Sequence, residues 1–286
     1  MNGILIIDKE PDWTAQDVVS KLRGITGERR IGHTGTLDPM ATGVLPIVIG
    51  KATRISDFLM ADDKEYLCEI AFGQSTNTED IWGDVIATTD QLPTEESFLE
   101  ALSSFEGPAL QIPPMYSAIK IGGKKLYELA RAGKTVERAP RKVVFHELEL
   151  IDFSREHATF RAKVSKGTYI RTLCKDLGEA AHSMAVMSAL RRIRSGSFSI
   201  EEAMTIGEFA DLTKEEQSRR LIPMEQALDL PSIQLDSTEA SRALQGQRIP
   251  TDVQFKDWVK VYSEDCFIGL GKITDSVLHV KKVLAR

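Results

Sequence analysis

The chain has 286 residues, of which 42% are hydrophobic, and its formal net charge at pH 7 is −6. No apolar run reaches about 18 residues, so we expect no membrane span. The three cysteines, Cys68, Cys174 and Cys266, are far apart and form no Cys/His cluster, which argues against a disulfide framework and against a metal site.

The first quarter of the chain alternates between strand and helix patterns. We predict strands at residues 3–8, 44–49 and 64–73, and helices between them at residues 14–25 and 52–60. Thr14 and Asp17 form a capping-box-like pair at the start of the first helix. Pro46 lacks an N–H donor, so it favours a sheet edge or a bulge for its strand.

The middle of the chain adds paired strands. After a polar, loop-like segment at 74–84, we expect a helix at 94–105, an extended segment at 111–118 and a short basic helix at 124–132. Two paired strands are expected at 143–153 and 158–165, followed by a turn at 167–171 and a helix at 172–181. Regular βαβ alternation is absent. The predicted class is therefore α+β, with a mixed, largely antiparallel sheet flanked by helices.

The C-terminal part predicts a separate β-rich unit. Residues 200–228 are expected to be mostly helical, and Pro223 and Pro231 bracket a boundary. Three short strand-like runs follow at residues 258–262, 266–273 and 278–284. We therefore expect two domains, at residues 1–230 and 231–286.

Charge is distributed unevenly along the chain. Residues 57–106 hold thirteen acids and one base, whereas residues 120–175 hold fourteen bases and six acids. A local basic face can bind phosphates even when the total charge is negative. An ordinary solvated surface is the alternative explanation of the same pattern.

Residues 32–46, GHTGTLDPMATGVLP, carry the strongest functional signal. They place Asp38 in a loop rich in Gly, Thr and Pro, directly before a buried strand. Pro39 restricts the backbone of the residue before it, so the loop has a defined shape. Loops held by rigid elements often carry reacting groups, although an ordinary Asp-Pro turn explains the residues equally well.

This stretch resembles the central motif of the TruB family, the tRNA pseudouridine-55 synthases, whose GHxGTLDPxAxGVLP aspartate is catalytic. The resemblance covers residues 3 to about 230 and implies a pseudouridine-synthase-like fold. It departs at residues 8–15, DKEPDWTA, where the family usually reads DKPxGxTS. Residues 231–286 resemble a short PUA-like RNA-binding module only weakly.

The resemblance assigns Arg171 and Tyr66 to the catalytic group beside Asp38. Arg171 matches the arginine of the family segment GTYIRxL, which bridges the catalytic aspartate. Tyr66 matches a tyrosine that stacks on the target uracil and is implicated in removing the C5 proton. Without the resemblance, Arg171 would be taken as a surface residue and Tyr66 as a core tyrosine.

The resemblance also implies four substrate-binding residues. His33 would enter the tRNA T-loop and hold it open after the target base leaves, although a general-base role is also open for it. Tyr169 and Leu190 match pocket residues, and Leu190 alone would be read as core. Lys120 ends the matching segment 113–120 and is expected near the active site.

The implied reaction isomerises uridine to pseudouridine at position 55 in the T-loop of tRNA. The base is flipped out, its C1′–N1 bond breaks, and C5 joins C1′. Asp38 would act as a nucleophile or as a base at the sugar, and both roles remain open. We expect no cofactor and no metal, because no redox change or external group is involved.

Two other functions fit part of the sequence. A non-catalytic tRNA-binding folding chaperone would use the same basic face, but it gives no reason for the motifs of Asp38, Tyr66 and Arg171 to occur together. A hydrolytic N-glycosylase would release free uracil. The expected partner is the T-arm of tRNA, and we expect a monomer. We expect a cytoplasmic location, because the N-terminus has no basic leader typical of a signal peptide.

Overall fold

The protein is described by a computed structural model that covers residues 1–253 and 257–285. Its larger sheet contains β1 (Gly3–Lys9), β2 (Ile31–His33), β3 (Thr42–Ile49), β4 (Lys64–Phe72), β7 (Gly107–Gln111), β10 (Arg141–Phe153), β11 (His157–Val164), β12 (Ala185–Ser195) and β13 (Phe198–Ser199). Two hairpins pair β5 (Gln74–Thr76) with β6 (Val85–Thr88), and β8 (Lys120–Ile121) with β9 (Lys124–Lys125).

The helices of this part are α1 (Ala15–Thr26), η1 (Gly50–Ile55), α2 (Ser56–Leu59), α3 (Glu95–Phe105), α4 (Leu126–Arg131), α5 (Ile170–Ala180), η2 (Ile200–Glu202), α6 (Ile206–Asp211) and α7 (Lys214–Arg219). The C-terminal part contains β14 (Ser232–Leu235), α8 (Ser237–Leu244), β15 (Ile249–Pro250), β16 (Trp258–Ser263), β17 (Cys266–Thr274) and β18 (Val277–Val283).

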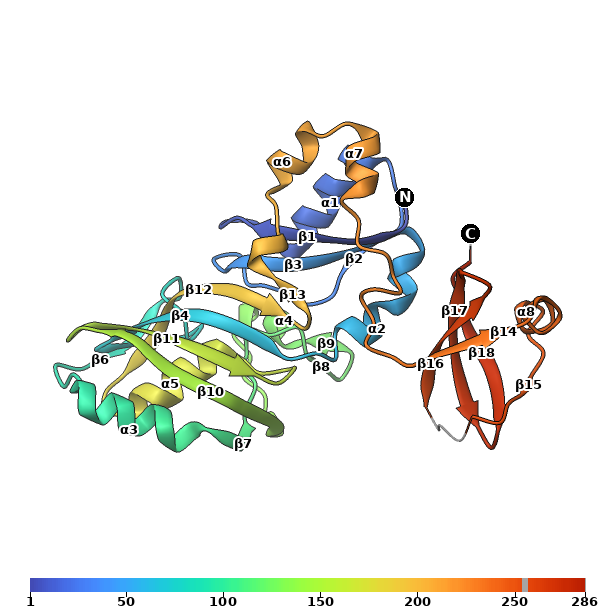
Figure 1. The fold of residues 1–286 in the computed structure, drawn as a ribbon. Helices are drawn as coiled ribbons and strands as arrows, with labels where there is room; N and C mark the ends of the chain where they lie inside the picture. The colour runs from blue at the N-terminus through green and yellow to red at the C-terminus, as the bar shows by residue number, and fades with distance from the viewer. Residues whose placement is uncertain (254–256, 286) are drawn as a thin grey trace.

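The larger sheet runs in the order β1-β3-β12-β4-β11-β10-β7, with β2 added to β3 and β13 to β12. Its pairings are antiparallel except for the short parallel contact of β3 with β12. The predicted α+β class with a mixed, largely antiparallel sheet is therefore confirmed. Figure 1 shows α3 and α5 against one part of this sheet and α1, α6 and α7 at its other end.

Both faces of the sheet are covered at its β1–β3 end, as the alternation along β1 shows. Leu5 and Ile7 pack into a core with residues of α1, α3 and α5, whereas Ile4 and Ile6 pack into a second core with residues of η1 and α2. Strand side chains alternate between the two faces, so an apolar strand such as β1 can serve both.

Capping chemistry explains where two important helices begin. Thr14 caps α1 in a capping box with Asp17, as predicted, and Gly27 ends the helix at a φ of 74°. Helix α5 begins at Ile170, two residues before the predicted start. Arg171 therefore lies in the first turn of a helix and not in the turn that precedes it.

Two sequence-based expectations were wrong. Strand β3 is an interior strand, because β1 pairs with one side of it while β2 and β12 pair with the other. On this second side, β12 pairs with residues 42–43 of β3 and β2 pairs with residues 47–49, so Pro46 lies between the two pairings and needs no N–H donor there. The Pro46 carbonyl accepts a hydrogen bond from Thr34 N–H at 3.1 Å. Residues 200–228 hold only short helices, because Thr205 and Thr213 each cap a new one.

The C-terminal sheet, in the order β14-β16-β17-β18-β15, packs against η1 and α2 (Figure 1). The Phe58 and Trp258 rings meet edge to face with centroids 5.1 Å apart. Arg54 Nη1 donates to the Val283 carbonyl at 2.5 Å, and Leu284 is buried in the second core. The β-rich module is thus attached to the N-terminal part by apolar and polar contacts.

Candidate active site

Asp38 lies in the loop of residues 34–41, which connects β2 to β3. The loop is closed on itself by the Ala41 N–H, which donates to the Asp38 carbonyl at 3.0 Å. Leu37, the neighbour of Asp38, is buried in the first core. The Asp38 side chain is 36% exposed, so its carboxylate is fixed by its neighbours and still open to a substrate.

Arg171 is the direct partner of Asp38. Its Nε lies 2.9 Å from Asp38 Oδ2, and its Nη2 donates to Asp38 Oδ1 at 3.5 Å. The arginine side chain is only 6% exposed. A paired guanidinium–carboxylate contact fixes both the position and the direction of the carboxylate. The structure therefore brings together the two residues that the sequence motifs single out.

Arg171 also joins two further segments to Asp38. Its Nη1 donates to the Thr78 carbonyl at 2.9 Å, and its Nη2 donates to the Tyr116 carbonyl at 2.7 Å. The Asp80 carboxylate lies 3.6 Å from the same Nη1. One buried guanidinium thus organises the site, and two carboxylates balance its charge.

The charge of Asp38 is set by opposing influences. Burial raises the pKa of Asp38 above its ordinary value, and the nearby Asp80 acts in the same direction. The Arg171 guanidinium opposes both, because an adjacent positive charge favours the ionised form. The carboxylate is therefore less solvated than a surface aspartate, and a less solvated carboxylate is a stronger base and nucleophile.

Lys9, at the end of β1, holds one side of the Asp38 loop. Its buried Nζ donates to the carbonyls of Glu10 at 2.9 Å, Trp13 at 2.6 Å and Pro39 at 3.0 Å. Burial lowers the pKa of Lys9 to about 8. Lys9 was noted in the sequence only as part of a variant motif, and nothing there predicted its burial.

Arg192, on β12, holds the other side of the loop. Its Nε donates to the Val44 carbonyl at 2.7 Å, and its Nη2 donates to the Gly35 carbonyl at 3.1 Å. The β12 backbone approaches so closely that a Cβ on Gly43 would lie 2.2 Å from the Arg192 carbonyl oxygen. Arg192 and Asp80 were both missed by the sequence analysis, because their partners lie far away in the chain.

Tyr66 and Leu190 lie in the core next to the Asp38 loop. Both are buried in the same apolar cluster as Leu37, and they come from the neighbouring strands β4 and β12. The cross-strand register pairs Tyr66 with Arg192 and Leu190 with Cys68. Their predicted roles toward a uracil ring remain predictions.

Tyr169 and His33 border the same region. Tyr169 is the N-cap residue of α5, and its N–H and carbonyl both bond to the Gln111 side chain, at 2.8 and 3.0 Å. Burial raises the pKa of the Tyr169 hydroxyl. Burial also lowers the pKa of His33, whose Nδ1 is buried without a hydrogen-bond partner in the described part of the chain.

Lys120 is the predicted site residue that the structure does not join to the others. It is exposed on β8, in a hairpin with β9. Within residues 1–253 and 257–285, the ion pair of Asp38 is made with Arg171 and none is made with Lys120. Its expected place near the active site therefore remains a prediction.

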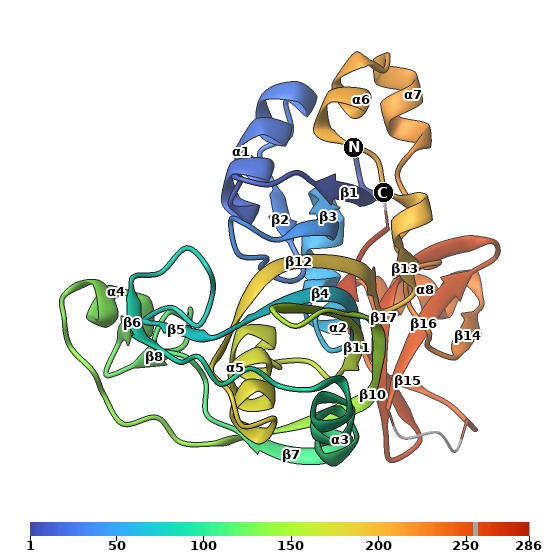
Figure 2. The same cartoon turned by 90° about the vertical axis from the view of Figure 1, so that its left-hand side faces the viewer.

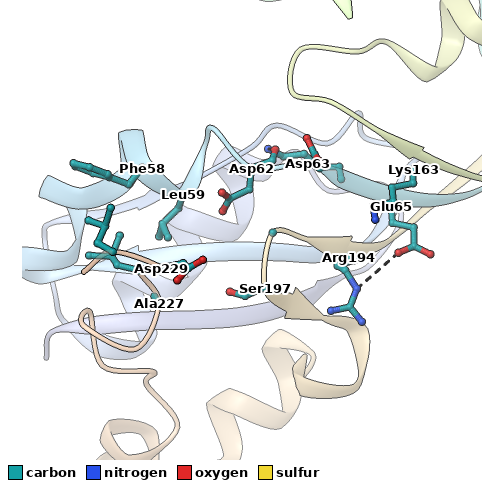
Figure 3. Close-up of a pocket in the computed structure, with 14 residues that line it drawn as sticks. Phe58, Leu59, Asp62, Asp63, Glu65, Lys163, Arg194, Ser197, Ala227 and Asp229 are labelled. Atoms are coloured by element: carbon teal, nitrogen blue, oxygen red, sulfur yellow. Dashed lines mark hydrogen bonds and ion pairs between the residues drawn. The ribbon is translucent and has the colours of Figure 1, made fainter. Parts of the chain in front are cut away.

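A separate cavity of about 520 Å³ lies beside the start of β4 and the segment 227–230 (Figure 3). Its lining does not include Asp38, Arg171 or Asp80. One ion pair lies within its lining, where Arg194 Nε is 3.7 Å from Glu65 Oε2. It therefore offers no reason to move the active site away from Asp38.

The described residues contain no group of three or more His, Cys, Asp or Glu side chains placed to bind a metal. None of the described helices is long and apolar enough to cross a membrane.

Comparison with protein families gives matches along most of the chain. Residues 23–170 match the TruB family pseudouridylate synthase (N terminal domain). Residues 171–229 match the tRNA pseudouridylate synthase B C-terminal domain, and residues 231–284 match the pseudouridine synthase II TruB C-terminal domain.

Individual relatives match over nearly their full length. The tRNA pseudouridine synthase B of Alkaliphilus oremlandii is 45% identical, with 95% of this chain and 93% of the relative covered. That of Streptococcus pneumoniae serotype 2 is 42% identical, with both chains fully covered. Among solved structures, a chain of a Cbf5-Nop10-Gar1 complex shares the fold with a TM-score of 0.75 and 27% identity, covering 98% of this chain and 84% of that one.

Proposed function

Because the chain belongs to the TruB family of pseudouridylate synthases, we propose that it converts uridine to pseudouridine at position 55 in the T-loop of tRNA. The observation that carries the proposal is the ion pair between Asp38 and the buried Arg171. It presents a fixed, partly exposed carboxylate at the surface of a site built by distant segments. Such a group is what chemistry at a ribose C1′ requires.

The reaction begins with removal of the target uridine from its loop, which costs a few kcal/mol. Stacking of the freed uracil on Tyr66 would return about 1–3 kcal/mol. The C1′–N1 bond then breaks, with Asp38 acting either as a nucleophile at C1′ or as a base at the sugar. After the base turns, C5 bonds to C1′. If Asp38 acted as the nucleophile, this step displaces its carboxylate from C1′; if it acted as the base, the sugar regains the proton that Asp38 removed. The C5 proton then leaves, and N1 takes up a proton. Atoms and electrons balance without a cofactor.

The remaining assignments belong to the same proposal. His33, Tyr169, Leu190 and Lys120 would contact the T-loop or the flipped base. The basic residues within 120–175 would bind the phosphate backbone. Residues 231–286 would form a second, RNA-binding domain after a catalytic domain at 1–230.

Two broader assignments complete the proposal. We infer a cytoplasmic location, because the three cysteines are free and such thiols persist in reducing compartments. A monomer is proposed because Asp38, Arg171 and Asp80 all come from one chain.

The test uses a tRNA transcript labelled with uridine tritiated at C5. Wild-type protein and the Asp38→Asn variant, which preserves the side-chain shape, are compared for tritium release and for transcript binding. We expect release only from the wild type, binding by both, and pseudouridine at position 55 by nearest-neighbour mapping. Near-normal release by Asp38→Asn would refute the assigned role of Asp38. Binding by both proteins without release by either would instead favour a folding chaperone.

A further inference from the structure

The segment that carries Asp80 also displays large apolar side chains to solvent. Trp82 is 57% exposed, and Ile81, Val85 and Ile86 close to it are also exposed. Figure 2 shows this segment as the loop between β5 and β6, which reaches toward β12. Grouped apolar exposure of this kind is typical of a binding surface, because it costs free energy when left in water.

Backbone contacts hold Trp82 on a tight turn. Its N–H donates to Asp80 Oδ1 at 3.1 Å, and the following Gly83 N–H donates to the Asp80 carbonyl at 3.3 Å. A Cβ on Gly83 would lie 2.2 Å from Thr78 Oγ1, so the turn is closely packed. On the other side, the Ile81 N–H donates to the Met187 carbonyl at 3.0 Å. The exposed indole is thus carried by a well-anchored loop.

The same contacts place Trp82 beside the proposed reaction centre. Asp80, which accepts from the Trp82 backbone, lies 3.6 Å from the Arg171 guanidinium that binds Asp38. Trp82 is two residues after Asp80, so their Cα atoms lie at most about 7.6 Å apart. Nucleotides next to a uridine held at Asp38 therefore come within reach of the indole.

The surrounding charge favours the face of a base over a phosphate. Glu79 precedes Asp80, and Asp84 follows the turn. Acids repel phosphates, whereas an aromatic ring stacks on any unpaired base whatever its sequence. RNA-modifying enzymes also derive part of their selectivity from the nucleotides that flank the flipped base.

We propose that Trp82 is a substrate-binding residue that stacks on an unpaired base of the RNA next to the flipped uridine. The inference rests on the proposed function, since it requires an RNA substrate at Asp38. Trp82 would act on binding and register of the RNA and not on the bonds that break and form. Its removal should therefore raise KM and Kd while leaving kcat at saturating RNA almost unchanged.

The test compares the wild type with Trp82→Ala, Trp82→Phe and Ile86→Ala on the tRNA transcript. Trp82→Ala should raise KM about 5- to 100-fold, and Trp82→Phe should recover most of the loss because it restores an aromatic face. Ile86 is a matched control, because it is 65% exposed on the same hairpin and has no ring. Ile86→Ala should change KM less than about 2-fold.

Three results would overturn the inference. One is a Trp82→Ala variant with the wild-type KM on a transcript that the wild type modifies, which would leave the proposed function intact. Another is an equal loss in Ile86→Ala, which would indicate general apolar contact. The third is a wild type that self-associates in sedimentation while Trp82→Ala is monomeric and binds RNA normally. Failure of the wild type to bind or modify the transcript would instead refute the proposed function itself.

Discussion

Replacing Lys9 by Met removes the buried amine that ties β1 to the Asp38 loop while keeping an unbranched side chain of similar length. The carbonyls of Glu10 and Trp13 lose the donor that Lys9 supplies, whereas the Pro39 carbonyl keeps the Asp12 N–H at 3.0 Å. An acceptor left unsatisfied costs about 2 kcal/mol, so the gross loss is about 4 kcal/mol. Burial of the charged amine lowers the pKa of Lys9 from 10.5 to about 8. Removing this desolvation cost adds back about 3 kcal/mol to the free energy of unfolding.

The net expectation is that Lys9→Met lowers the free energy of unfolding by about 1 kcal/mol at pH 7. Urea denaturation of both proteins measures the difference, and circular dichroism verifies that the variant is folded. Because Pro39 directly follows Asp38, kcat on the transcript should also fall in conditions where the variant is folded. A stability change under about 0.5 kcal/mol would refute the reasoning, because it would mean that the Glu10 and Trp13 carbonyls are satisfied without Lys9.

The lowered pKa of Lys9 also fixes the sign of a pH effect. Between about pH 8 and 10.5 the unfolded lysine binds more protons than the folded one, so folding becomes more favourable as the pH rises. The stability gap between the wild type and Lys9→Met should therefore widen across this window. A constant gap would show that Lys9 keeps an ordinary pKa in the folded protein.

Three further predictions concern other parts of the molecule. Asp80→Asn should lower the single-turnover rate about 10- to 100-fold with little change in RNA binding, because it removes a counter-charge of the guanidinium; an unchanged rate would exclude Asp80 from the site. Gly43→Ala should lower Tm by more than about 10 °C, because its Cβ would lie 2.2 Å from a carbonyl oxygen and φ is +98°; an unchanged Tm would contradict that packing. Changing Lys124, Lys125 and Lys134 to Gln should weaken tRNA binding and flatten its salt dependence, whereas an equal slope would mean a merely solvated face.

Local signals in the sequence were enough to predict several elements. The Thr14–Asp17 pair located the start of α1, and the strand predicted at residues 64–73 corresponds to β4. These features depend on neighbours within a few residues. The resemblance to the TruB family supplied what spacing alone lacks, namely that Arg171 meets Asp38 across 133 positions.

Other features escaped because they depend on distant partners. Lys9 and Arg192 are charged residues at fully buried positions, which sequence rules assign to the surface. Asp80 lies in a polar stretch that resembles an ordinary loop, and only the approach of Arg171 gives it a role. Pro46 lies in an interior strand although prolines usually lie at sheet edges. The sequence does not reveal that the strand paired with β3 changes from β12 to β2 beside Pro46.

The buried cations around the Asp38 loop answer an electrostatic problem that an RNA substrate creates. Phosphates that approach the site raise the pKa of a carboxylate, because like charges disfavour its ionised form. Arg171 at 2.9 Å and the buried Lys9 both act in the opposite direction on Asp38. Since hydrogen bonds to backbone carbonyls hold both cations, their charges stay beside Asp38 when RNA binds. The contacts that shape the loop therefore also oppose the rise in the pKa of Asp38.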